Sequence, residues 1–306
     1  MSGPLPHLGL LRFAGADAHS FLQGQVSHDT RRLSEGSPLL AAYCTAQGRA
    51  VAVLHLLPHT SGVIALLPRE LVPTTLERLR RFVLRAKVTL EDLSQQFRVV
   101  GEHGAAALDA AGLRLPDAAG YVEHAGIGVA RISADPSRYW VIGPAASLAA
   151  RGLADERGAG GSLERIERDW RLADIRAGLA QVYAPTSELF VPQMLNLDLI
   201  DGISFTKGCF TGQEILARTQ HLGRIKRRMF RLRLPKGSWT VGHALRLTDG
   251  RAGRLTELAA IGEAFEALAV LNLEAGAAEL EAAPGDAVEA VELPLPYPVR
   301  SAPAAP

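Results

Sequence analysis

The chain has 306 residues, of which 47% are apolar and 21% are charged, and its formal net charge is +1. This length and composition are typical of a folded protein with two domains, and they exclude a disordered chain. A net charge close to zero provides no overall field that would attract the chain to nucleic acid or to an acidic surface. Such a partner would have to be met by a local basic patch.

The two cysteines, Cys44 and Cys209, lie far apart and belong to no CxxC pair and to no cluster of cysteines and histidines. This spacing argues against a disulfide framework and against a zinc or iron–sulfur site built from protein ligands alone. The N-terminus has no signal-peptide pattern, and no apolar run has the length of a membrane span. We therefore expect a cytoplasmic protein with no resident metal and no membrane partner.

The first half of the chain alternates between short strands and helices. Apolar runs bounded by glycine and turn residues predict strands at 8–13, 39–45, 50–57, 63–67, 88–90, 97–100, 126–133 and 139–142. Helical spacing predicts helices at 16–23, 74–85, 105–111 and 145–153. This order of elements predicts two similar α+β units, although no sequence repeat connects them. The loop 154–161 is expected to be flexible because of its composition.

The most regular helix is expected between Ser162, a favourable N-cap, and Gly178, a favourable stop. One of its faces is apolar and carries Trp170. The simplest interpretation of Trp170 is that of a core anchor on this face. Residues 185–202 follow without any periodicity but with many apolar side chains, which predicts a buried loop that lines a pocket.

Two aspartates, Asp198 and Asp201, end this apolar loop. They could orient Lys207 or bind a ligand, but acidic residues beside a glycine are more often turn residues. From residue 225 onward, short runs separated by glycine, aspartate and proline predict a small β domain. The tail 301–306 has little to bury and is expected to be mobile.

Cys209 stands in a segment that is typical of a reactive cysteine. Gly208 and Gly212 lie on either side of it and permit backbone conformations that a Cβ atom would forbid. Lys207, two positions before it, brings a positive charge that favours a thiolate over a thiol. The alternative interpretation is a buried and unreactive cysteine.

A helix is predicted directly after Cys209. Thr211 and Glu214 have the spacing of a capping box, and Gln213 lies between them. Cys209 would then lie two residues before the N-cap, close to the partial positive charge of the helix start. This charge also favours the thiolate.

Residues 207–214, KGCFTGQE, resemble the signature of the YgfZ family of folate-binding proteins, which is related to the aminomethyltransferases of glycine cleavage. The resemblance continues through FVPQMLNL at 190–197, through Ala217 and Arg218, and through FLQGQVS at 21–27. It therefore covers most of residues 8–230. The octapeptide is a specific signal, whereas the N-terminal stretch alone is a weak one.

The resemblance implies an α+β fold in which ferredoxin-like units surround a central hole, followed by a small C-terminal β-barrel. It implies a folate-binding domain at 1–224 and a barrel domain at 225–306. Trp170 matches a tryptophan at the folate site, and no tryptophan stands near Leu8, where some members carry a second aromatic residue. The implied cofactor is tetrahydrofolate or a one-carbon derivative. The implied cofactor-binding residues are Trp170, Gln213, Glu214, Gly208 and Gly212.

One departure separates this chain from the aminomethyltransferases, which carry an acidic pair in the second strand of the first hairpin. The matching residues 49–55 contain no carboxylate. The groups needed for proton transfer at the folate nitrogen are therefore missing there. We expect no aminomethyltransferase activity.

The resemblance implies an accessory protein that supports iron–sulfur cluster assembly or maintenance in enzymes such as those that thiolate tRNA. Its partners would be folate and iron–sulfur client enzymes or assembly proteins. Cys209 would be the functional thiol, tuned by Lys207, and it could act as a cluster ligand, a redox thiol or a nucleophile.

Two alternatives belong to other classes. One is an active folate-dependent one-carbon transferase with a relocated base. The other is an RNA-binding module that uses the basic cluster Arg224, Lys226, Arg227, Arg228, Arg231 and Arg233. Direct contact with tRNA is not expected, because the chain lacks an RNA motif and because strand arginines usually form only a solvated face.

Overall fold

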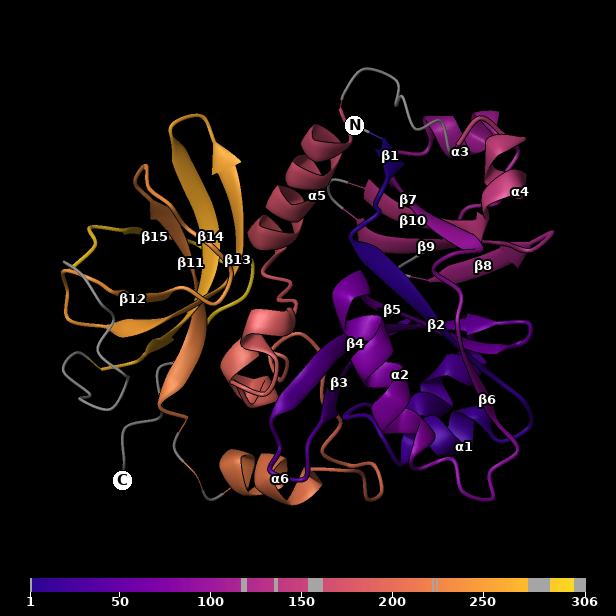
Figure 1. Ribbon diagram of the computed structural model, residues 1–306, viewed down its shortest axis with the longest axis horizontal. Coiled ribbons are helices and arrows are strands. Elements are labelled where there is room, and N and C mark those ends of the chain that lie inside the picture. Colours follow the sequence, from indigo (N-terminus) through magenta and orange to yellow (C-terminus); the bar gives the residue numbers. More distant parts are fainter. Residues whose placement is uncertain are drawn as a thin grey trace. The chain divides into compact units, whose positions relative to one another are not determined.

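The computed structural model describes residues 2–116, 120–134, 137–153, 162–221, 223, 225–274 and 287–299. Within these ranges the chain forms three five-stranded sheets and several short helices (Figure 1). This is an α+β fold, as predicted. The expected flexible loop at 154–161 and the expected mobile tail at 301–306 lie outside the described residues.

The chain divides into two compact units that interleave along the sequence. The first contains residues 1–41, 54–170 and 207–210, and the second contains 42–53, 171–206 and 211–306. The predicted boundary between residues 224 and 225 therefore falls inside the second unit. As a boundary between domains it stays a prediction.

The N-terminal sheet has the order β3 (Leu39–Cys44), β4 (Ala50–His59), β5 (Gly62–Pro68), β2 (Leu8–Ala14), β6 (Thr89–Asp92). Its helices are α1 (Ala18–Gln23) and α2 (Val72–Arg80), with 3-10 turns η1 (Thr30–Glu35) and η2 (Arg69–Leu71). The strands agree with the predicted ranges to within two residues at each end. Helix α2 ends at Arg80, earlier than the predicted end at residue 85.

The second sheet has the order β1 (Gly3–Pro4), β7 (Phe97–His103), β10 (Ser137–Pro144), β9 (Ile127–Ala134), β8 (Tyr121–His124). Successive side chains of a strand point to opposite faces, and β10 shows this alternation. Tyr139 and Val141 pack with Leu108 of α3 (Ala106–Ala110) and Leu148 of α4 (Ala145–Ala149). Trp140 and Ile142 pack instead into a cluster with residues of β2, β4 and β5.

Helix α5 (Leu163–Ala177) is the longest helix, and it begins and ends as predicted. The Ser162 hydroxyl accepts a hydrogen bond from the N–H of Arg165 at 3.3 Å. Gly178 follows the helix with a φ of 67°, which is the left-handed conformation common at helix ends. Among the described residues, no helix is both long and apolar enough to cross a membrane.

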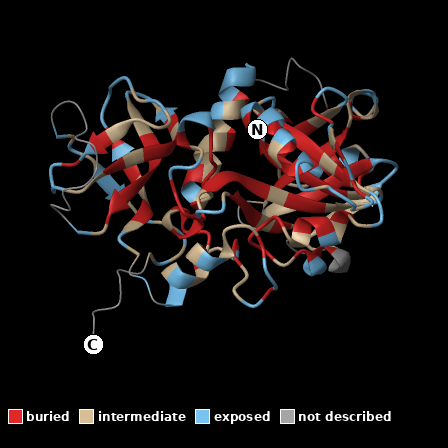
Figure 2. Ribbon diagram, turned by 60° about the horizontal axis from the view of Figure 1, so that its bottom comes forward, coloured by how far each residue is buried: buried red, intermediate tan, exposed pale blue. Residues whose placement is uncertain are grey.

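The third sheet lies in the second unit and has the order β12 (Ala244–Arg246), β13 (Ala252–Ile261), β14 (Ala264–Asn272), β11 (Arg227–Leu234), β15 (Val291–Leu293). The segment that leads into β15 also bridges to the other edge of the sheet, where Val288 pairs with Leu247. One segment thus contacts both edges of this five-stranded sheet, and the predicted closed barrel stays a prediction. Buried residues follow the strands of the sheets in Figure 2.

The second unit also contains η3 (Ala184–Thr186), η4 (Pro192–Leu195) and helix α6 (Gln213–His221). Within the apolar loop 185–202, Phe190, Val191, Leu195 and Leu197 are buried, as predicted, whereas Leu189 is exposed. That the loop lines a pocket stays a prediction. Gln193 and Asn196 have no exposed surface, and their side-chain amides donate to the carbonyls of Leu216 and Met229, at 2.8 Å each. The loop is therefore held by side-chain hydrogen bonds, because it has no regular main-chain ladder of its own.

Candidate functional site

Lys207 is buried, with an exposed fraction of 4%. Its Nζ atom donates to the carbonyls of Gln23 and Val26, both at 2.7 Å, and of His28 at 2.9 Å. An ammonium group has three hydrogens, so these carbonyls use every donor that Lys207 has. Lys207 therefore fixes the segment 207–210 to the chain that follows α1.

Burial lowers the pKa of Lys207 to about 8, an effect opposed by the negative charge of Asp29 and reinforced by Arg31. At neutral pH the group is still protonated and can fill all three hydrogen bonds. The Nζ atom also lies 4.8 Å from the centre of the Phe210 ring, at the other end of the same segment. Hydrogen bonds from Arg31 hold the pKa of Asp29 well below its usual range. The lysine is thus surrounded by fixed groups.

Cys209 lies in this segment and is exposed, whereas Cys44 is buried in β3. Burial raises the pKa of Cys44 to about 12. Thiols react as thiolates, so the structure favours Cys209 as the accessible thiol of the two. The roles of Cys209 as a functional thiol and of Lys207 as its tuning group stay predictions. The contacts of Lys207 show in addition that it positions the segment.

The two glycines beside Cys209 differ in what their backbone requires, and the role of both in cofactor binding stays a prediction. A Cβ atom at Gly208 would meet no atom within 4 Å, and its φ is not in the left-handed region. Gly212 has a φ of 85°, and a Cβ atom there would lie 2.6 Å from the Thr45 carbonyl oxygen. Gly212 is therefore required by the backbone, while Gly208 leaves open space next to Cys209.

Helix α6 begins at Gln213, one residue later than the capping box requires. Gly212 is the residue directly before the helix, so Thr211 does not take the N-cap position. Glu214 lies exposed in the first turn, where its charge stabilises the helix through the macrodipole. The role of Gln213 and Glu214 in cofactor binding stays a prediction.

Trp170 is a core residue with an exposed fraction of 1%. Gly101 allows its ring to approach β7, since a Cβ atom there would lie 2.5 Å from the ring. The imidazole of His103 meets the ring edge-on at 5.3 Å between centroids, and the Arg138 guanidinium carbon lies 5.2 Å from the ring centroid. These partners differ from those of Lys207. The structure thus places the two predicted parts of the site in different surroundings.

The structure brings a second tryptophan, Trp140 of β10, into the same cluster as Trp170 and Leu8. The indole N–H groups of both tryptophans are buried and have no acceptor in the part of the chain that the structure describes. The ring of His55 lies 4.7 Å from the ring of Trp140, and burial together with the charge of Arg138 lowers the pKa of His55 to about 4. The sequence predicted that Trp140 lies on a strand. It did not predict toward which face of the sheet the Trp140 side chain points.

Two arginines of the basic cluster predicted as a possible RNA contact are neutralised by acidic side chains of the protein. Arg228 forms two hydrogen bonds with the Asp198 carboxylate, at 2.6 and 2.9 Å, and both side chains are buried. Arg231 pairs with Glu266 at 2.6 Å. Arg224 lies outside the described residues. Asp198 is consequently a partner of Arg228 and does not orient Lys207, whose donors all contact carbonyls.

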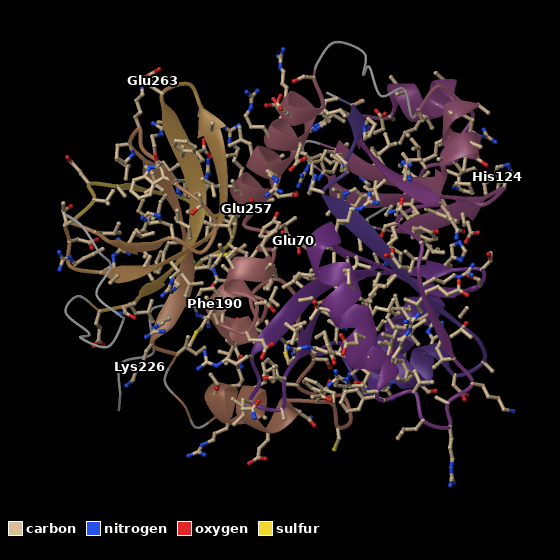
Figure 3. All side chains as sticks on the ribbon, viewed as in Figure 1. Glu70, His124, Phe190, Lys226, Glu257 and Glu263 are labelled. Carbon is tan, nitrogen blue, oxygen red and sulfur yellow. The ribbon has the colours of Figure 1, made fainter. Side chains whose placement is uncertain are left out.

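Sequence reasoning missed a buried polar cluster in the second unit around Glu257 of β13 (Figure 3). Arg171 donates to the Glu257 carboxylate at 2.9 Å, and the Tyr183 hydroxyl also donates to it. Burial raises the pKa of Glu257 although Arg171 opposes the shift. A register shift between Leu255 and Glu257 in β13 places this carboxylate in the interior, and no sequence pattern indicates it.

Comparison with known proteins identifies relatives along most of the chain. The tRNA-modifying protein YgfZ of Colwellia psychrerythraea is 32% identical over 230 residues, which cover 74% of this chain and 69% of the relative. The tRNA-modifying protein YgfZ of Edwardsiella ictaluri is 33% identical over 226 residues, which cover 73% of this chain and 68% of the relative. The chain belongs to the YgfZ family. No family model matches it.

The fold of this YgfZ family member is that of the aminomethyltransferases. The glycine cleavage system aminomethyltransferase T of Bartonella henselae aligns with a TM-score of 0.67 over 89% of this chain and 78% of the other chain. The two sequences are only 16% identical in this alignment. The likeness therefore concerns the fold alone, and it confirms the predicted fold class.

Proposed function

We propose that the protein is a folate-binding accessory factor in tRNA modification, which supports iron–sulfur enzymes through the Cys209 thiol. The single observation that carries this proposal is the contrast between the two thiols. Cys209 is exposed on a segment fixed by Lys207, whereas Cys44 is buried and its pKa is raised to about 12. The YgfZ relatives, named as tRNA-modifying proteins, support the biological context.

A single thiolate cannot hold an iron–sulfur cluster by itself, since these clusters usually take four protein ligands. Among the described residues no group of three or more His, Cys, Asp and Glu side chains could hold a metal ion. If Cys209 ligates a cluster, the remaining ligands must come from the client enzyme. The open space beside Gly208 suits such an approach, because no side chain of the described chain stands there.

The polar groups around Trp170 support the proposal that a folate binds there, because two of them lack partners in the described chain. A pterin ring carries carbonyl and ring-nitrogen acceptors, and the buried N–H groups of Trp140 and Trp170 lack acceptors in the described residues. The neighbouring Arg138 supplies a positive charge. A bound reduced folate would supply one-carbon chemistry at its ring nitrogens. Trp140, Trp170 and Arg138 would hold it and exclude water. Because Trp170 is almost fully buried, a folate can contact its ring only if the side chains that cover the ring move.

The thiol is tested by complementation in cells that lack their own YgfZ protein, with the level of thiolated tRNA as the measurement. Cys209→Ser is expected to accumulate as a folded protein and to fail to restore thiolation. Cys44→Ser is the matched control and is expected to restore it, because its thiol is buried and unreactive. Full complementation by a well-expressed Cys209→Ser variant would make this cysteine a packing residue and would refute the proposal.

Folate binding is tested by titrating tetrahydrofolate and following intrinsic fluorescence. The chain has three tryptophans, Trp140, Trp170 and Trp239, and the last belongs to the second unit. Trp239→Phe should retain the change in fluorescence, whereas Trp170→Phe should lose most of it and should bind several-fold more weakly. Phenylalanine keeps a ring in the core and removes the N–H. If Trp170→Phe binds tetrahydrofolate as tightly as wild type, the folate does not bind beside Trp170.

We further propose that the protein has no aminomethyltransferase activity. Strand β4 supplies no carboxylate at residues 49–55, and His55, the titratable group at the end of this stretch, has a pKa lowered to about 4. The purified protein should show no tetrahydrofolate-dependent turnover of an aminomethyl donor. Robust turnover would favour the one-carbon transferase.

A further inference from the structure

The first unit contains a pocket of about 560 Å³. Its walls come from the segment that joins β1 to β2, from helix α4 and from the loop before β7, and Trp170 and Cys209 are not among its lining residues. Leu8 and Val99 form part of its apolar wall, while Ala149 and the exposed Leu163 also line it. A pocket of this volume is in the range of small-molecule sites, roughly 300–1,000 Å³.

The charged lining of this pocket is entirely positive. Arg69 and Arg98 line it, and no acidic side chain does. The Arg98 guanidinium is fixed by hydrogen bonds from Nη1 to the carbonyls of Gln95 at 3.1 Å and Phe97 at 3.0 Å. The Arg69 side chain has no hydrogen-bond or ion-pair partner within the described ranges of the chain. A partly buried guanidinium without a counterion favours an anionic ligand.

Ser94 supplies a neutral donor in the same pocket and is buried, with an exposed fraction of 4%. Its Oγ atom accepts the N–H of Leu10 at 3.0 Å. The hydroxyl hydrogen must therefore point elsewhere, and within the described chain it has no acceptor. Buried hydroxyl groups are normally satisfied, so this hydrogen is available to a ligand oxygen.

We propose that this pocket binds a small carboxylate with an apolar body of about the size of a bicyclic aromatic ring. The carboxylate contacts the Arg69 guanidinium and the Ser94 hydroxyl, and the apolar body lies against Leu8, Val99 and Leu163. Planar guanidinium groups bind carboxylates through two parallel hydrogen bonds, and the apolar wall gains from burial of the ligand ring. This pocket shares Leu8 with the cluster around Trp170 but is not lined by Trp170 itself, and the inference does not rest on folate binding.

The experiment uses anilinonaphthalene sulfonate as a fluorescent reporter on the purified full chain. Its fluorescence should rise with saturation at a single site, and naphthoate should displace it. Naphthalenemethanol, which has the same ring and no charge, should displace it only at a concentration about tenfold higher or more, the factor expected from loss of a charged hydrogen bond. Absence of saturable binding, or equal displacement by both compounds, would overturn the proposal.

Two pairs of variants assign the binding to this pocket. Arg69→Leu should weaken reporter binding by about tenfold, whereas Arg85→Leu, an exposed arginine outside the pocket, should leave it unchanged. Ala149→Trp should block the pocket, and the neighbouring Ala150→Trp should not, because only Ala149 lines it. Thermal unfolding checks that each variant is folded. Unchanged binding in both Arg69→Leu and Ala149→Trp would place the reporter elsewhere.

Tetrahydrofolate as competitor separates this site from the folate site. We expect tetrahydrofolate to leave the bound reporter in place, even at concentrations that saturate the change in tryptophan fluorescence. Complete displacement that is also lost in Arg69→Leu would identify the pocket as the folate site and overturn the claim of a separate one. If the protein binds no folate at all, the reporter experiments still decide the carboxylate site.

Discussion

The segments around Cys44 and Cys209 each carry a thiol, but the first is fixed by burial in a sheet and the second by the contacts of a neighbouring lysine. Cys44 ends a strand of a five-stranded sheet, is buried, and has a pKa raised to about 12. Cys209 lies outside any helix or strand, and one buried lysine fixes its segment through three hydrogen bonds. A thiol can therefore stay accessible while a neighbouring buried side chain, here that of Lys207, holds its segment in place.

The largest expected effect concerns the rates of alkylation. Iodoacetamide between pH 6 and 9 should modify Cys209 at least about a hundredfold faster than Cys44, because a buried thiol with a raised pKa forms little thiolate. Peptide mass spectrometry measures the two rates. In denaturant both cysteines should react at similar rates, which is the control. Comparable labelling in the native protein would remove the distinction between the two segments.

The next effect tests the lysine. Lys207→Met keeps most of the side-chain volume but leaves the carbonyls of Gln23, Val26 and His28 without their donor, which should lower the free energy of unfolding by about 3 kcal/mol. Urea denaturation measures this loss. Lys87→Met, at an exposed lysine, is the control and should change stability by less than about 0.5 kcal/mol. A Lys207→Met protein as stable as wild type would show that the hydrogen bonds do not fix the segment.

A smaller effect separates the two glycines beside Cys209. Gly212→Ala should destabilise the protein by about 1 kcal/mol or more, because its φ is 85° and a Cβ atom would approach the Thr45 carbonyl. Gly208→Ala should be neutral within about 0.5 kcal/mol, since nothing lies within 4 Å. If Gly208→Ala folds normally but fails in the complementation assay, the open space serves a partner. Equal destabilisation by both changes would contradict this difference between the two glycines.

The last effect is a dependence of stability on pH. The pKa of Lys207 is lowered by burial to about 8, from an ordinary value of 10.5. Between these two values the unfolded chain binds more protons at this residue than the folded protein does. The contribution of Lys207 to the free energy of unfolding must therefore rise with pH in this window and be constant below it. The difference between wild type and Lys207→Met, measured by urea denaturation from pH 7 to 10, should follow this curve. A flat difference would show that the pKa is not lowered.

The sequence by itself determined the fold class, most strand positions and the limits of α5. These features depend on local periodicity and on capping residues such as Ser162 and Gly178, which act within a few positions of the chain. The burial of Cys44 also followed from its apolar strand. The octapeptide at 207–214 was specific enough to indicate the family.

Tertiary structure alone decided which groups meet. Lys207 contacts carbonyls about 180 residues away, and Arg228 pairs with Asp198 across 30 residues. No local pattern encodes such partners, since a lysine or an arginine can satisfy its charge in many ways. The same reason explains why the Glu257 cluster and the pocket beside Arg69 were missed. Their chemistry arises where distant strands and helices bring polar side chains out of water together, and only the folded chain fixes that arrangement.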